Sequence, residues 1–146
     1  MIKTLVFKGI KYNGVQESIQ STIQKMLDLA NKEKSFVYGY INGTPIVIEP
    51  NMSFDEAIDT IHDIRHGKIT IAICSDTANN ISPVDMAKSM AVLAKQNDFV
   101  ISSFNGIVFR ILKNMSAEDA IRVFNKIIHH NSIQNVSIIE MKQRKL

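Results

Sequence analysis

The chain has 146 residues, of which 45% are hydrophobic and 21% charged, and its formal net charge is +3. This length and composition suit one domain with a sizeable apolar core and exclude a disordered chain. A single cysteine excludes an intramolecular disulfide, the N-terminus does not resemble a signal peptide, and no apolar run is long enough to cross a bilayer. We therefore expect a soluble, cytoplasmic protein.

The first half of the chain predicts a strand, a helix, two strands and a second helix, in residues 2–10, 15–31, 36–41, 44–48 and 54–66. The two adjacent strands flank Asn42-Gly43, a dipeptide that tolerates the positive φ angles of a tight hairpin turn. Ser53 and Glu56 have the spacing of a capping box, so they predict where the second helix begins. Gly67 predicts where that helix ends.

The second half predicts the same succession. It consists of a strand in residues 68–74, a helix beginning after Ser82, strands in residues 99–104 and 107–112, a helix beginning after Ser116, and a closing strand in residues 136–139. Asn105-Gly106 again occupies the predicted hairpin turn. The strand 68–74 has almost no polar interruption, which is typical of a strand covered on both faces.

The two halves are related as an internal repeat. Residues 36–67 align without a gap to residues 99–130 at an offset of 63, and 12 of the 32 positions are identical, against roughly two expected by chance. The repeat predicts one compact α+β domain, residues 1–146, built from repeats of about residues 1–67 and 68–140. Residues 141–146 form a short basic tail.

The element order also predicts how the repeats pack. Any β-α-β-β-α-β window has the order of a ferredoxin-like split unit, so we expect an α/β sandwich with a mixed sheet covered by helices. We further expect pseudo-twofold symmetry in which homologous edges of the two repeats meet, as they would in a dimer.

The positions that the two copies share serve structural purposes, since they are turn residues, helix caps and core residues. No nucleophile and no pair of carboxylates is shared. His66 and His129 are shared, and both are predicted at helix C-termini, where a protonated imidazole interacts well with the terminal carbonyls. His62 lies four residues before His66, but the second copy has Asn125 there. We therefore predict no metal, no cofactor and no catalytic residue.

We interpret the remaining differences between the copies as a change of surface, with Val47 aligned to Arg110 as one example. This pattern favours a non-enzymatic binding or interaction protein whose partner is a small anionic molecule or another protein, with a homo-oligomer as a further possibility. A small enzyme centred on the loops that follow the first strand of each repeat is one alternative.

Two loops are the candidate ligand site, because each follows the first strand of a repeat, where open α/β sheets place their ligands. A nucleotide or a phosphorylated metabolite is the expected ligand class. The candidate residues are Lys8, Lys11 and Tyr12 in the first loop and Ser75, Asp76, Thr77, Asn79 and Asn80 in the second. Cys74 precedes the second loop at the end of an apolar strand, so we expect a buried, inert thiol.

A second alternative is a nucleic-acid-associated protein. It depends on basic residues of the second repeat together with the basic tail. The candidate residues are Arg110, Lys113, Arg122 and Lys126. Acidic neighbours dilute this set, and the sequence has no aromatic stacking pattern of the kind that RNA-binding sheets use.

Overall fold

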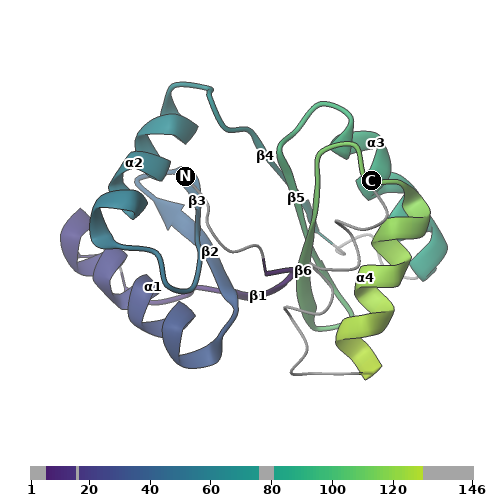
Figure 1. Cartoon of the computed structure of the whole chain (residues 1–146), viewed down its shortest axis with the longest axis horizontal. Helices are drawn as coiled ribbons and strands as arrows, with labels where there is room; N and C mark the ends of the chain where they lie inside the picture. The colour runs from purple at the N-terminus through teal and green to yellow at the C-terminus, as the bar shows by residue number, and fades with distance from the viewer. Residues whose placement is uncertain (1–5, 16, 76–80, 130–146) are drawn as a thin grey trace.

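The computed structural model describes residues 6–15, 17–75 and 81–129. Over these residues the chain forms six strands and four helices (Figure 1). In order they are β1 (Lys8–Lys11), α1 (Ile19–Glu33), β2 (Phe36–Ile41), β3 (Thr44–Ile48), α2 (Phe54–Arg65), β4 (Ile71–Ser75), α3 (Pro83–Ala94), β5 (Phe99–Phe104), β6 (Ile107–Leu112) and α4 (Ala117–His129). The predicted closing strand and basic tail lie outside the described residues.

The predicted internal repeat is present in the element order. β1 and β4, β2 and β5, β3 and β6, and α2 and α4 each begin 63 residues apart, which gives two β-α-β-β-α halves. The two hairpin turns have the same backbone: φ is 50° at Asn42 and 52° at Asn105, and a glycine with positive φ follows each asparagine. Asparagine and glycine tolerate this left-handed region, so the local sequence determines both turns.

Serine caps begin the helices where the sequence predicts them. The Glu56 amide donates to Ser53 Oγ at 3.1 Å, and the Ser53 amide donates to Glu56 Oε1 at 3.0 Å. In the second half Asp119 takes the part of the glutamate, since its amide donates to Ser116 Oγ at 3.1 Å and its Oδ2 accepts from the Ser116 amide at 3.2 Å. These reciprocal bonds satisfy amides that a helix N-terminus would otherwise leave unpaired.

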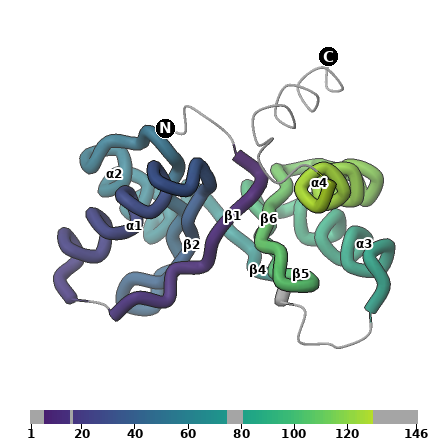
Figure 2. The backbone as a smooth tube through the Cα atoms, turned by 90° about the horizontal axis from the view of Figure 1, so that it is seen from below, coloured from purple at the N-terminus to yellow at the C-terminus, as the bar shows by residue number. Residues whose placement is uncertain are grey.

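The strands form one mixed sheet in the order β3-β2-β1-β6-β5-β4, and the sheet curls into a nearly closed barrel. Each half contributes three strands, and its two helices lie on the outside of its own strands (Figure 1). β1 runs between the two halves (Figure 2), where it pairs in parallel with β2 and antiparallel with β6.

Two expectations about the sheet are wrong. A ferredoxin-like split unit has another strand between the two strands that its first helix connects, whereas β1 and β2 are direct neighbours. Homologous edges do not meet either, because β1 pairs with β6 and not with β4. β1 is equivalent to β4, and β6 is equivalent to β3, so a symmetric closed ring would also pair β4 with β3. Among the described strands β3 and β4 are instead the two ends of the sheet.

Apolar side chains form three clusters because the strands are covered on both faces. In the first half Val37 and Ile48 point outward to the helices, while Phe36, Tyr38 and Val47 point inward. The second half has its own outer cluster beneath α3 and α4. The inward residues of both halves share one interior cluster, which fills the barrel and to which no helix contributes a described residue.

Candidate functional site

The sheet opens into a wedge where β1 and β6 diverge. The paired positions of these strands are Lys8 with Phe109 and Gly9 with Val108. Beyond Gly9, β1 continues to pair with β2 as far as Lys11 opposite Tyr38. The end of β1 therefore separates from the start of β6, close to the β5–β6 turn.

A hollow of about 450 Å³ lies in this wedge. We call it the β1–β6 hollow, and its lining residues are Lys8, Gly9, Ile10, Lys11, Gly106, Ile107, Val108 and Ile127. Two lysines are combined with aliphatic side chains, and the described lining residues include no acidic one. Such a lining suits a small molecule that has an anionic group and an apolar part.

The structure brings together only part of the predicted ligand site. Lys8 and Lys11 both line the β1–β6 hollow, although they belong to a strand and not to a loop. Tyr12 does not line it, because its ring packs against the outer apolar cluster of the first half. Ser75 is the last residue of β4; Asp76, Thr77, Asn79 and Asn80 lie outside the described residues.

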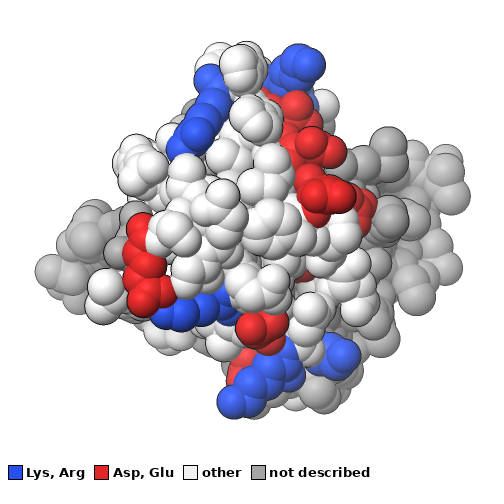
Figure 3. All heavy atoms as spheres, turned by 90° about the vertical axis from the view of Figure 1, so that its left-hand side faces the viewer, with Lys and Arg blue, Asp and Glu red and all other residues white. Residues whose placement is uncertain are grey.

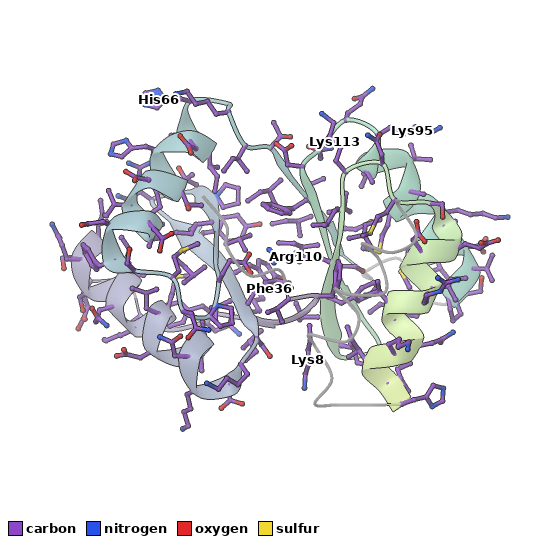
Figure 4. All side chains as sticks on the ribbon, in the orientation of Figure 1. Lys8, Phe36, His66, Lys95, Arg110 and Lys113 are labelled. Carbon is purple, nitrogen blue, oxygen red and sulfur yellow. The ribbon has the colours of Figure 1, made fainter. Side chains whose placement is uncertain are left out.

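A buried ion pair lies between the two halves, at the centre of the molecule (Figure 4). Arg110 Nη2 donates to Glu49 Oε1 at 2.6 Å, and Nη1 lies 2.5 Å from Oε2. The side chains of Arg110 and Glu49 are 0% and 1% exposed. The Nη1–Oε2 contact is an ion pair, and Arg110 Nε has no hydrogen-bond partner among the described residues.

Two aromatic rings enclose the guanidinium. Its carbon lies 4.5 Å from the centre of the Phe36 ring and 4.8 Å from the centre of the Phe99 ring. Both distances are within the range of cation–π attraction. Phe36 and Phe99 are equivalent positions of the repeat, so one arginine is held between a symmetric pair of rings.

The burial of Arg110 corrects two predictions. The difference between Val47 and Arg110 was predicted to lie on the surface, but it lies inside the barrel. Arg110 was also a candidate nucleic-acid contact, and a fully buried guanidinium cannot make one. A signal for this was present in the sequence. Arg110 and Glu49 have opposite charges, and each replaces an apolar residue of the other repeat, Val47 and Leu112 respectively.

Burial raises the pKa of the Glu49 carboxyl, and the charge of Arg110 and its hydrogen bond oppose this shift.

The other basic candidates do not form one surface with Arg110. Arg122 and Lys126 line a second hollow of about 430 Å³, whose described lining residues all belong to α4 and include Glu118. Lys113 is exposed just after β6 and is not among them. On the face of the first half, acidic and basic side chains are interspersed around a largely uncharged middle (Figure 3).

The histidines lie where the sequence predicts them. His66 is the C-cap of α2 and His129 is the last residue of α4, whereas His130 lies outside the described residues. The rings of His62 and His66 are 6.1 Å apart, centre to centre. Among residues 6–15, 17–75 and 81–129 there is no group of three or more His, Cys, Asp or Glu side chains with the geometry to hold a metal ion.

Cys74 is half-buried in β4 and packs against the outer cluster of the second half. Burial raises the pKa of its thiol, and the thiolate is the reactive form. We expect Cys74 to react with a disulfide reagent at pH 7 at least tenfold more slowly in the folded protein than in denaturant. The absorbance of the released aromatic thiol measures both rates, and equal rates would contradict the expectation.

In the part of the chain that the structure describes, no helix is both long enough and apolar enough to cross a membrane. Comparisons with protein-family models, with curated proteins and with solved structures gave no significant match to this chain.

Proposed function

We propose that this protein binds a small anionic molecule, a nucleotide or a phosphorylated metabolite, in the β1–β6 hollow and does not transform it. The observation that carries the proposal is the presence of Lys8 and Lys11 in a hollow of about 450 Å³ with no acidic residue among its described lining residues. An ammonium group forms charge-assisted hydrogen bonds with phosphate or carboxylate oxygens.

The aliphatic part of the lining supports the same proposal. Ile10, Ile107, Val108 and Ile127 offer apolar area to the body of a ligand. Gly106 carries no side chain and nothing lies within 4 Å of the place where a Cβ would be, so a ligand can approach the backbone closely there. Anchoring by charge and burial of an apolar body together are typical of small-molecule sites.

Ligand binding is expected to raise the melting temperature. The probes are inorganic phosphate, adenosine monophosphate and a sugar phosphate, each titrated into the full chain. A ligand at 100 times its Kd stabilises the folded state by about 2.7 kcal/mol. The Lys8→Met/Lys11→Met variant is expected to bind at least tenfold more weakly, because each lysine contributes a charged hydrogen bond worth about 1.5–3 kcal/mol.

A matched control removes two lysines elsewhere. Lys95 and Lys113 lie at the opposite end of the molecule from Lys8 (Figure 4), so Lys95→Met/Lys113→Met lowers the net charge equally without touching the hollow. This control should retain the wild-type Kd. An equal loss of affinity in both variants would assign the effect to overall charge. If no probe shifts the melting temperature, that result would count against a small anionic ligand.

Binding of nucleic acid is the second candidate. It is supported by Arg122 and Lys126, which line the same hollow on α4. The candidate predicts a steep loss of oligonucleotide affinity with salt, and a shallower salt dependence in Arg122→Ala/Lys126→Ala. Binding of a protein partner, self-association and catalysis at the β1–β6 hollow are further proposals, none of which has a specific geometric observation in its favour.

A further inference from the structure

The two repeats differ in charge at the two positions that form the buried ion pair. Arg110 occupies the position at which the first repeat has the buried Val47, and Glu49 occupies the position at which the second repeat has the half-buried Leu112. The first half thus brings one buried anion to the barrel interior, and the second half brings one buried cation. The two meet at 2.5 and 2.6 Å.

The other contacts between the halves do little to distinguish a first-repeat half from a second-repeat half as a packing partner. The strand pairing between them is short, with Lys8 opposite Phe109 and Gly9 opposite Val108, extended by the Arg110 amide donating to the Phe7 carbonyl at 3.0 Å. The interior cluster consists of aliphatic and aromatic side chains of the described strands. Apolar contacts are non-directional, and because the halves have similar skeletons, a half could present much the same apolar surface to either type of half.

We propose that the Arg110–Glu49 pair selects which half packs against which, so that a first-repeat half accepts a second-repeat half and rejects a copy of itself. Two first-repeat halves from different chains would bury two Glu49 carboxylates without a cation. Two second-repeat halves would bury two Arg110 guanidinium groups without an anion. A buried charge without its partner is strongly destabilising, whereas a paired one is tolerated.

The ion pair need not make the fold more stable to act in this way. Replacing a buried ion pair by apolar residues of suitable size is often neutral for stability or better. A single buried polar contact can nevertheless fix the register and partner of an assembly, as in coiled coils. The pair is therefore expected to influence the choice of partner more than the free energy of unfolding.

The test makes the two repeats alike at these positions. In Glu49→Leu/Arg110→Val each residue is replaced by the one that the other repeat already has there. Wild type and variant are unfolded in denaturant and refolded at a series of protein concentrations, and light scattering after size exclusion gives the masses. Wild type should return to its original mass at every concentration. The variant should form additional, larger species whose fraction rises with concentration and exceeds that of wild type several-fold.

Two further variants complete the design. Glu49→Gln/Arg110→Met also removes both charges but keeps longer side chains, so it decides the matter if the first variant does not fold. Lys95→Met/Lys113→Met removes two surface charges and should refold as wild type does. The proposal is overturned if the uncharged variants return to the wild-type mass at all concentrations. Failure of both to fold would also overturn it, since the pair would then be required for the core itself.

Discussion

Replacing Gly9 by alanine is expected to destabilise the protein by about 3 kcal/mol or more, at the upper end of the effects of overpacking a core. A Cβ atom at Gly9 would lie 2.6 Å from Phe36 Cε1 and closer still to two other atoms of that ring. The ring cannot simply move away, because the carbon of the Arg110 guanidinium lies over it, 4.5 Å from the ring centre. Denaturant unfolding followed by circular dichroism measures the loss.

Gly39→Ala is the matched control, since Gly39 lies in the neighbouring strand β2. The nearest side-chain atoms to its added Cβ would be Tyr12 Cβ at 3.3 Å and Met26 Cε at 3.4 Å, which requires shifts of only a few tenths of an ångström. Its cost should stay below about 1 kcal/mol. Gly9→Ala should also cost less when Phe36 is leucine. Similar costs for the two alanine variants would show that the contact with the ring is not the cause.

Arg110→Met is expected to reduce the free energy of unfolding by about 3–5 kcal/mol, the usual cost of leaving the partner of a buried ion pair unpaired. The variant keeps a long side chain between Phe36 and Phe99, so the loss reports mainly on the abandoned Glu49 carboxylate. Lys113→Met is the control, because Lys113 follows the same strand but is exposed. The control should change stability by less than about 0.5 kcal/mol.

The loss in Arg110→Met should depend on pH. Burial already raises the pKa of Glu49, and removing Arg110 removes the interactions that oppose this rise. A carboxyl whose pKa is higher in the folded state binds its proton more tightly there. Protonation of this carboxyl therefore stabilises the folded state. The stabilisation is complete below the unfolded-state pKa and is lost as pH rises through the folded-state pKa. The variant should therefore recover stability relative to wild type as pH falls from 8 towards 5, and a deficit that is constant over this range would contradict the assignment to Glu49.

Local structure is the part of the fold that the sequence predicts well. Asn42-Gly43 and Asn105-Gly106 predict both hairpin turns, and Ser53 and Ser116 predict where two helices begin, because each signal acts within a few residues. The repeat then requires that equivalent segments form the same elements. Strand order is different in kind. It depends on which sheet edges meet, and nothing local to β1 indicates that its second neighbour is β6.

The candidate site was predicted in part for the same reason. Lys8 and Lys11 could be chosen as charges near the end of a first strand, but the wedge that joins them to Ile107 and Ile127 arises from the unforeseen pairing of β1 with β6. The buried ion pair could have been inferred from the sequence. Its signal is the replacement of Val47 by Arg110 and of Leu112 by Glu49 between the copies, which has meaning only when both differences are considered together.

The position of β1 beside β6 has a consequence for how the chain reaches its native state. Lys8 and Phe109 are neighbours across the sheet although about a hundred residues separate them along the chain. Closing so long a loop has a high entropic cost, and folding is slower when such distant pairings dominate. During synthesis β1 must wait for its second neighbour until β6 and the residues between the two strands have left the ribosome.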